Sequence, residues 1–265
     1  DCGDRDACCR CGGALGEDRR SGDEKGIGAR NNEEMTTIAT WNLHHMGRPI
    51  QIPDGVVQVI KQVRPDVLVL TEYVDRGAFK VDLQEKCGYA FPMVSLAGNE
   101  PRQNQVLMAS RVEQEVGGLS APEVDEAATT NFLHRRFNRF DLEVVGFRAP
   151  HNQSEKPMKP ENLVKYWRQF KKMALEKARQ KVVFIGDFNI GVKDVDEAGR
   201  RAVASLVRKG FRLVGEQGGL DRALLCPELR LKSFSVIEAV GSHRLTGSKG
   251  DRALSDHPML LVEVE

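Results

Sequence analysis

Polar side chains suited to phosphate chemistry occur in five short segments between residues 40 and 257. Each segment follows or adjoins an apolar run, so strands of a sheet would bring carboxylates, amides and one imidazole to a shared edge. Such a set suits a divalent cation that holds a phosphate. The segments are Thr40-Trp41-Asn42, Thr71-Glu72, Gly186-Asp187-Phe188-Asn189, Leu220-Asp221-Arg222 and Ser255-Asp256-His257.

The clearest buried strand pattern, Lys181–Gly186, leads directly into Asp187 and Asn189. Gly186 lets the backbone turn closely at the strand end, and the alternation of an extended chain directs Asp187 and Asn189 to one side. The carboxylate can orient or deprotonate a water, and the amide can donate to a phosphoryl oxygen. This segment alone leaves a second interpretation open, an N-cap Asp followed by a turn Asn.

A second segment places a carboxylate and an imidazole side by side, at Asp256 and His257 before the last apolar strand. A lone His is more often structural than catalytic. With Asp221 available elsewhere to orient its ring, His257 becomes a candidate base or phosphate donor, because a carboxylate partner fixes the tautomer and the basicity of an imidazole.

Glu72 ends the apolar strand Val67–Leu70, where a charge at the mouth of a buried sheet needs a partner or a metal ion. The surroundings are poor in Cys and His, which favours Mg²⁺, with Mn²⁺ as a substitute. Asn42 either orients Glu72 or binds the same ion through its carbonyl. The sequence therefore predicts a magnesium site near Glu72, Asn42 and Asp256.

The composition is that of a soluble protein with 265 residues, 40% of them hydrophobic and 29% charged. A net charge of +1 gives no global attraction to nucleic acid, so a polyanion site must be a local patch. No apolar stretch reaches the roughly 18 residues of a spanning helix, and no secretory signal is visible. We therefore expect a cytoplasmic protein without a transmembrane segment.

Residues 1–34 are rich in Gly, Arg, Asp and Glu and almost free of large apolar side chains. Such a composition does not bury enough surface to offset the entropy of ordering, so we predict a disordered or non-native tail. Its four cysteines lack the spacing of a structural zinc knuckle, which leaves zinc as a minor alternative. The remaining two cysteines give the body of the chain, residues 35–265, a disulfide-free character.

Strands and helices alternate along residues 35–265, without a repeat or an internal linker. Helical spacing of apolar residues begins after Pro53, and a second helix is predicted at Glu161–Gln180 with Trp167 and Phe170 inward. A third is predicted at Asp196–Lys209. The other predicted strands are Thr37–Trp41, Val106–Ala109, Asn131–Arg139, Leu142–Phe147, Arg230–Val236 and Met259–Val264.

The five segments resemble, in order and spacing, the motifs of the endonuclease/exonuclease/phosphatase superfamily of DNase I-like metal-dependent phosphoesterases. The resemblance extends over nearly all of residues 36–265. It implies an α/β four-layer sandwich: two packed mixed β-sheets flanked by helices, with the site at one end of the sheets. The alternation of elements alone does not distinguish this fold from a doubly wound sheet.

The resemblance also implies roles for the matching residues. Glu72 resembles the principal metal ligand, with Asn42 and Asp256 close to the ion. Asp187 resembles the residue that positions or activates the attacking water, and Asn189 the amide that stabilises the transition state. Asp221 and His257 resemble the family's Asp–His pair.

One position departs from the pattern. Many nucleases of the family place a His or Tyr where this chain has Phe147 and Arg148, with His151 following a few residues later. Either Arg148 supplies the phosphate contact, as a guanidinium readily does, or His151 reaches back into the site. Asn104 and His44 are further candidates for substrate contact.

These observations favour a Mg²⁺-dependent phosphodiester hydrolase, a nuclease acting on DNA or RNA. The alternative is a phosphatase or phosphodiesterase for inositol phosphates or phospholipid head groups, to which the basic cluster Arg135, Arg136 and Arg139 would be suited. A non-catalytic binding scaffold is a third possibility, disfavoured because every expected catalytic residue is present. Few aromatic residues argue against recognition of an extruded, damaged nucleotide.

Overall fold

A computed structural model describes residues 35–44, 52–96, 103–150, 158–190, 197–247 and 253–265. These residues belong to one unit, Glu33–Glu265. The predicted tail, residues 1–34, lies outside the described residues, so its boundary and its disorder stay predictions. No helix within the described ranges is long and apolar enough to cross a membrane.

Strands at both ends of the described chain meet in a first six-stranded sheet, because β14 pairs with β1. The strands, in order across the sheet, are β11 (Leu231–Ile237), β14 (Met259–Val264), β1 (Thr36–Asn42), β2 (Val67–Tyr73), β4 (Gln105–Ser110) and β3 (Met93–Val94). β1 and β2 are parallel, and the other neighbours are antiparallel. The carboxyl ends of β1 and β2 therefore lie at one edge.

A second six-stranded sheet has the same design, with one parallel pair, β7 and β8, among antiparallel neighbours. Its strands, in order, are β5 (Glu115–Val116), β6 (Phe132–Phe137), β7 (Leu142–Arg148), β8 (Val182–Asp187), β10 (Asp221–Leu225) and β9 (Arg212–Val214). A short 3₁₀ turn, Asn138–Phe140, joins β6 to β7. β12 (Ala239–Val240) and β13 (His243–Arg244) form a separate hairpin.

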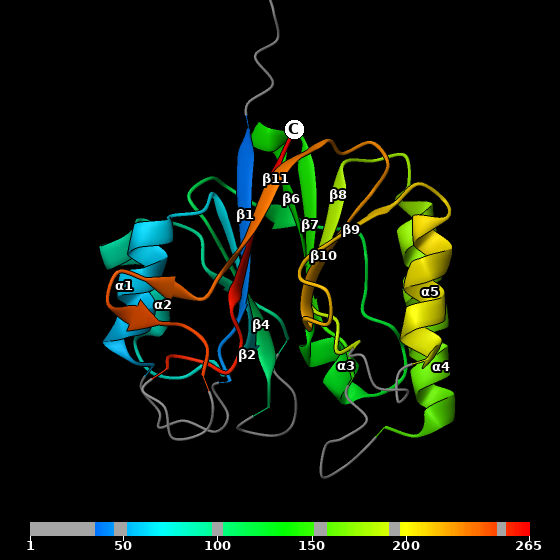
Figure 1. The fold of residues 1–265 in the computed structure, drawn as a ribbon, viewed down its shortest axis with the longest axis horizontal. Helices are drawn as coiled ribbons and strands as arrows, with labels where there is room; N and C mark the ends of the chain where they lie inside the picture. Colours follow the sequence, from blue (N-terminus) through cyan, green and yellow to red (C-terminus); the bar gives the residue numbers. More distant parts are fainter. Residues whose placement is uncertain (1–34, 45–51, 97–102, 151–157, 191–196, 248–252) are drawn as a thin grey trace, which may run out of the picture. The chain divides into compact units, whose positions relative to one another are not determined.

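The two sheets pack face to face, and helices cover their outer faces (Figure 1). Val69 of the first sheet and Ile185 of the second share the apolar core between the sheets. The helices are α1 (Asp54–Val63) and α2 (Phe79–Cys87) on the first sheet, and α4 (Pro160–Glu176) and α5 (Glu197–Val207) with the short α3 (Glu126–Thr130) on the second. The predicted four-layer sandwich is confirmed.

Burial along α4 follows the predicted helical face. Trp167 and Phe170 are buried against β7 and β8 and contact one another edge to face. Lys177, at the C-terminal end of the helix, is partly buried, because its Nζ lies 2.7 Å from Glu143 Oε2 and its side chain is only 15% exposed. The helix ends at Glu176, four residues before the predicted end.

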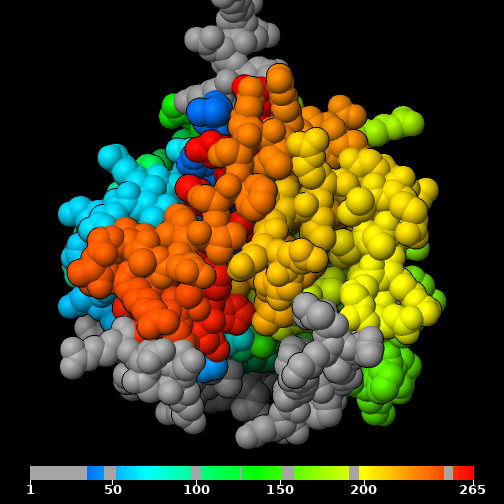
Figure 2. All heavy atoms as spheres, viewed as in Figure 1, coloured from blue at the N-terminus to red at the C-terminus, as the bar shows by residue number. Residues whose placement is uncertain are grey.

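The segment before β14 reaches across to the layer that α1 and α2 form. Figure 2 shows the orange residues of β11 and of the β12–β13 hairpin lying beside the cyan residues of that layer, with the yellow residues of α5 on the other side. The hairpin contacts α1, since a side chain at Gly55 would meet His243 and Leu254. The chain thus returns to the first sheet next to the end of β1.

Acid should destabilise the fold through His134, whose side chain is 1% exposed on β6. Its Nδ1 accepts the backbone N–H of Leu119, and its Nε2 lies 2.9 Å from Glu143 Oε2. Burial outweighs the attraction of Glu143 and lowers the pKa of His134 to about 4. Because this value is below that of the unfolded chain, stability is complete above pH 6.5 and falls towards pH 4.

The shift corresponds to roughly 3 kcal/mol of unfolding free energy lost between pH 7 and pH 4. Urea unfolding of the wild type and of His134→Gln at both pH values checks this, and the variant should lose correspondingly less. Equal losses in the two proteins would show that His134 is not the titrating group.

Candidate active site

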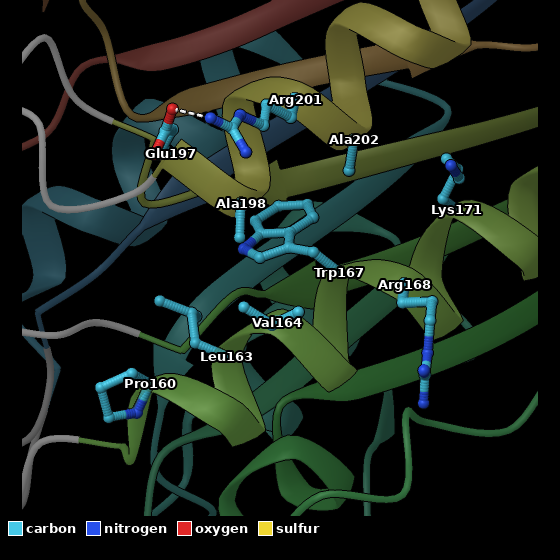
Figure 3. Close-up of a pocket in the computed structure, with 10 residues that line it drawn as sticks. All are labelled: Pro160, Leu163, Val164, Trp167, Arg168, Lys171, Glu197, Ala198, Arg201 and Ala202. Atoms are coloured by element: carbon cyan, nitrogen blue, oxygen red, sulfur yellow. Dashed lines mark hydrogen bonds and ion pairs between the residues drawn. The ribbon is translucent and has the colours of Figure 1, made fainter.

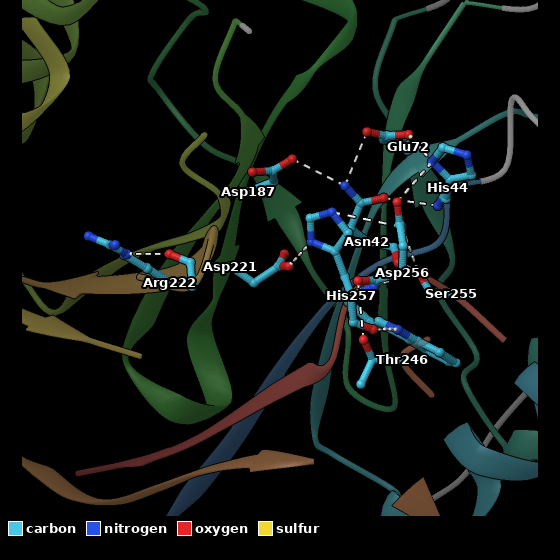
Figure 4. A network of polar contacts seen from close by, with 12 residues as sticks. Asn42, His44, Glu72, Asp187, Asp221, Arg222, Thr246, Ser255, Asp256 and His257 are labelled. Carbon is cyan, nitrogen blue, oxygen red and sulfur yellow. Dashed lines mark hydrogen bonds and ion pairs between the residues drawn. The ribbon is translucent and has the colours of Figure 1, made fainter. Parts of the chain in front are cut away.

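The predicted residues of all five segments meet at one edge of the two sheets (Figure 4). The parallel strands β1 and β2 deliver Asn42 and Glu72 from the first sheet, and β8 delivers Asp187 from the second. Asp221 begins the antiparallel β10 and is paired in register with Asp187. The loop before β14 adds Asp256 and His257.

Gly186 sets the direction of the Asp187 side chain. Its φ of +143° is one that other residues rarely adopt, and a Cβ at this position would lie 2.0 Å from the carbonyl oxygen of Phe147. The backbones of β7 and β8 therefore approach as closely as glycine permits. The next residue, Asp187, is 1% exposed and opens onto the shared edge.

Asn189 is held by the side chain of Asp187 and by the residue that follows β7, Ala149. Its N–H donates to Asp187 Oδ1 at 2.9 Å, and its Nδ2 donates to the carbonyl of Ala149 at 2.8 Å. Its φ of +50° is left-handed, a conformation that Asn tolerates better than most residues. Asp187 and Asn189 are therefore joined by a hydrogen-bonded turn, which matches the turn Asn that the sequence left open and differs from the extended chain that was expected here.

Asn42 connects the two sheets. Its Nδ2 donates to Glu72 Oε1 and to Asp187 Oδ2, each at 3.1 Å, while its Oδ1 accepts the backbone N–H of His44 at 2.9 Å. The fully buried amide thus turns its donor side towards both carboxylates. Of the two roles that the sequence leaves open for Asn42, this geometry favours orientation of Glu72 over binding a metal through the carbonyl.

Glu72 lies inside β2 rather than after it. The pairing of β2 with β4 shifts register between Leu70 and Tyr73, and Glu72 has a φ of +50° at this irregularity. Burial alone would raise the pKa of Glu72, but the hydrogen bond with His44, the charge of Arg148 and the bond from Asn42 lower it to about 2. The carboxylate is therefore ionised at neutral pH.

His257 and Asp221 form the predicted pair, with Nδ1 2.5 Å from Asp221 Oδ2. Burial alone would lower the pKa of His257, but the bond and charge of Asp221 raise it to about 9, so the imidazole is a cation at neutral pH. Burial, followed by the charge of Asp221, raises the pKa of Asp187 to about 6. The site thus holds one carboxylate near neutral pKa beside an imidazolium.

Two contacts that the sequence analysis did not identify fix the loop carrying His257. Ser255 Oγ donates to the carbonyl of Asn42 at 2.6 Å, and the indole N–H of Trp41 donates to the carbonyl of His257 at 3.0 Å. A Trp inside a buried strand needs an acceptor for its N–H, which was the available signal for Trp41. Both contacts tie the loop that carries His257 to β1.

The carboxylates of Glu72 and Asp256 offer the hard oxygen ligands that Mg²⁺ prefers. His44 Nδ1 lies 3.6 Å from Glu72 Oε2 and 3.6 Å from Asp256 Oδ2, so both carboxylates face one small volume. Among the described residues, no three His, Cys, Asp or Glu side chains are grouped to hold an ion. The donor set fits an ion that takes two carboxylates and completes its shell with water and substrate phosphate.

Arg148 ends β7 opposite Asp187 and extends to the first sheet. Its Nε and Nη2 each lie 2.9 Å from Glu72 Oε1, and its Nε lies 3.6 Å from Asp187 Oδ2. The structure thus brings Arg148 into the site, while His151 lies outside the described residues. Arg148 occupies the place where many relatives were expected to carry a His or Tyr.

The two candidates for substrate contact lie at the rim. His44 follows β1, and its side chain is 51% exposed. Asn104 precedes β4, and its Oδ1 is buried with no hydrogen-bond partner in the described part of the chain. Their positions near the site edge are established, and their contacts with substrate stay predictions.

A groove on the outer surface lies away from these groups, between α4 and α5 (Figure 3). Trp167 forms its floor, and Arg168, Lys171 and an ion pair between Glu197 and Arg201 form its walls. Its lining residues include no pair of carboxylate and imidazole. It therefore lacks the chemistry of the sheet edge.

The sequence profile of the Endonuclease/Exonuclease/phosphatase family matches residues 39–257, and the chain belongs to this family. A search of curated proteins finds no match. Among solved structures, an endonuclease/exonuclease/phosphatase from Beutenbergia cavernae has a TM-score of 0.62 at 17% identity, over 87% of this chain and 71% of the other.

Two further solved structures are nucleic-acid enzymes by their printed descriptions. An AP endonuclease from Archaeoglobus fulgidus has a TM-score of 0.60 at 18% identity, over 86% of this chain and 98% of the other. A 3′ phosphatase from Neisseria, bound to a product DNA hairpin, has a TM-score of 0.59 at 17% identity, over 87% and 99%. At these identities the likeness establishes the DNase I-like fold alone.

Proposed function

We propose that this protein is a Mg²⁺-dependent nuclease that hydrolyses phosphodiester bonds of DNA or RNA by attack of water on phosphorus. The observation that carries the proposal is the meeting of Asp187, Asn42 and Glu72, from both sheets, beside the His257–Asp221 pair. Membership of a family of phosphoesterases supports hydrolysis. The DNA enzymes among its structural neighbours support a nucleic-acid substrate.

In the proposed reaction, each residue has a role that its contacts suit. Asp187 accepts a proton from the attacking water, for which a pKa of about 6 is well placed. His257 donates from Nε2 to a phosphate oxygen, because Asp221 holds its Nδ1 and keeps the ring cationic. The amide of Asn189 has a second N–H, beyond the one that Ala149 accepts, to donate to the same phosphate.

Glu72 and Asp256 would hold the Mg²⁺, or Mn²⁺ in its place, which when bound supplies positive charge to the phosphate. Asn42 keeps the Glu72 carboxylate turned towards the site through its hydrogen bond. His44 and Asn104 are proposed to contact substrate beyond the phosphate. The roles of all these side chains rest on position and donor chemistry.

The inositol phosphate alternative loses its main support. Arg135, Arg136 and Arg139 follow Asn131, which lies beside Arg148 at the site edge, along β6 and the turn after it. At about 3.3 Å per strand residue, Arg135 lies roughly 13 Å from that edge and the others farther. This basic cluster does not line the site.

A substrate panel tests the proposal. Supercoiled DNA, single-stranded RNA, bis-p-nitrophenyl phosphate and an inositol polyphosphate are incubated with Mg²⁺, Mn²⁺ or EDTA, beside His257→Ala as a control for contaminating nucleases. Metal-dependent cleavage of DNA or RNA that His257→Ala loses is expected. Phosphate release from the inositol polyphosphate alone would transfer the enzyme to the phosphatase branch, and inactivity on all four would favour a binding scaffold.

Replacing Glu72 with Gln should raise the Mn²⁺ concentration for half-maximal activity by at least about tenfold, because a charged ligand is lost. The fold should persist, since the amide oxygen of Gln still accepts from Asn42 and Arg148. A Mn²⁺ titration of activity checks this, with the exposed Glu176→Gln as the matched control. An unchanged titration would contradict the assignment of Glu72 as a ligand.

A further inference from the structure

The guanidinium of Arg148 stands between the two sheets as the counter-ion of two buried acids. It donates from Nε and Nη2 to Glu72 Oε1 and lies 3.6 Å from Asp187 Oδ2. The two carboxylate side chains are 11% and 1% exposed, so water screens them little. Buried carboxylates need a nearby cation, and for Asp187 the nearest guanidinium is this one.

The charges of the site require this cation in the metal-free protein. Four carboxylates, those of Glu72, Asp187, Asp221 and Asp256, lie around Asn42, and the imidazolium of His257 is bonded to Asp221. His44 faces Glu72 and Asp256 from the half-exposed side. Arg148 is therefore the cation that Glu72 and Asp187 share, beside the contribution of His44 to Glu72 and of His257 to Asp187.

The two oxygens of Glu72 are in different surroundings. Oε1 receives three N–H donors, from Asn42 and from Arg148, whereas Oε2 faces the volume shared with Asp256 and His44. A divalent cation bound at Oε2 would share one carboxylate with the guanidinium. Two cations on one carboxylate repel each other, so each must weaken the attachment of the other.

We infer that Arg148 is an exchangeable counter-ion: Glu72 and Asp187 give up the guanidinium when a divalent cation binds, and the released guanidinium then binds a non-bridging oxygen of the substrate phosphate. A guanidinium fork suits carboxylate and phosphate equally, because both present paired oxygens to its parallel N–H groups. Arg148 is only 22% exposed and already lies at the site, so the transfer needs a change of side-chain torsions alone. The inference rests on the proposed metal-dependent function and adds to it a link between the metal and phosphate recognition.

The test compares Arg148→Met and Arg148→Lys with the wild type by calorimetric titration of Mn²⁺, and then of inorganic phosphate into the Mn²⁺-loaded proteins. Met removes the competing cation, so Mn²⁺ should bind about tenfold more tightly and phosphate at least tenfold more weakly. Lys keeps the charge without the fork, so Mn²⁺ affinity should stay near that of the wild type while phosphate affinity falls. The inference would be overturned if Arg148→Met bound Mn²⁺ no more tightly than the wild type does. It would also be overturned if both variants bound phosphate as tightly as the wild type.

A measurement on the wild type covers the case in which Arg148→Met does not fold. The ¹H–¹⁵N resonance of Arg148 Nε, identified by its loss in Arg148→Lys, should shift as Mg²⁺ saturates the site and shift again on addition of phosphate. A resonance that stays in place through both titrations would refute the exchange. Arg148→Met that folds only when Mn²⁺ is present would support it, since the metal then replaces the missing counter-ion.

These readouts need no turnover, so they separate this inference from the proposed nuclease activity. Tighter Mn²⁺ binding by Arg148→Met, in a protein inactive on every substrate of the panel, would uphold the exchange and refute the nuclease. If the wild type cleaves nucleic acid while the wild type and Arg148→Met bind Mn²⁺ with equal affinity, the nuclease proposal would be upheld and the exchange refuted. Absence of Mn²⁺ binding by the wild type and both variants would overturn both.

Discussion

Replacing Asp187 with Asn is expected to lower kcat by about 10³-fold or more on whichever phosphodiester the enzyme cleaves. The substitution keeps the size of the side chain and removes the oxygen that would take the proton from water. Loss of a general base costs typically 10²- to 10⁴-fold, and the amide also removes charge that orients Asn42 and Arg148. This is the largest effect on activity that we expect from a single atom exchange.

The same variant should fold normally. Burial and the charge of Asp221 raise the pKa of the buried carboxyl to about 6, so the fold stabilises its ionised form less well than water does, although that form predominates at neutral pH. An amide oxygen still accepts the N–H of Asn189, although its NH₂ must face the donors of Asn42 and Arg148. These effects oppose each other, and we expect a Tm within a few degrees of the wild type.

Initial rates with Mg²⁺ and thermal unfolding in EDTA measure the two halves of this prediction. Asp141→Asn is the matched control, since Asp141 is 82% exposed in a left-handed turn that Asn also tolerates. It should leave kcat and Tm unchanged. An active Asp187→Asn would remove Asp187 from the chemistry, and an unfolded one would make its role structural.

The sequence predicts the bounds of a strand best where the strand's own residues are enough to identify it. Met259–Val264 forms β14 with the predicted bounds, and Lys181–Gly186 forms β8 within one residue. Both are apolar runs flanked by polar residues, so the pattern of a buried strand is local. The position of Asn189 beside Asp187 depends instead on the left-handed turn after the strand, where an extended chain was expected.

Features that depend on pairing between distant strands were not predictable. Glu72 lies within β2 at a positive φ, because the pairing with β4 shifts register there, and no local signal marks this irregularity. The contact of Arg148 with Glu72 joins residues 76 positions apart in different sheets. The sequence named both residues, but their direct pairing depends on how the two sheets pack.

The short helix α2 was not predicted, because its apolar pattern is weak. α2 buries only Phe79, Leu83 and Cys87, a narrow stripe at every fourth residue, while Val81 between them is 46% exposed. Such a pattern is weak beside that of α4. The layer arrangement itself came from the family resemblance, because alternating strands and helices fit a doubly wound sheet equally well.

Replacing Gly186 with Ala is expected to destabilise the fold by more than about 4 kcal/mol, a range that single substitutions reach only through backbone strain or severe overpacking. The new Cβ would lie 2.0 Å from the carbonyl oxygen of Phe147, and a φ of +143° is strained for any side chain. Because β7 and β8 pair across this point, relief requires the two central strands to separate. Asp187 and Arg148, which pair with each other one residue beyond the contact, would then lose their alignment.

Gly88→Ala is a control that measures the cost of a positive φ for alanine without a steric clash of the new Cβ. Gly88 has a φ of +74°, yet a Cβ there meets nothing within 4 Å, so its cost should be only the roughly 1–2 kcal/mol of a left-handed alanine. Urea unfolding of both variants, with far-UV circular dichroism to detect a chain that does not fold, gives the comparison. If Gly186→Ala cost no more than Gly88→Ala, the close approach of β7 and β8 would not be what fixes the position of Asp187.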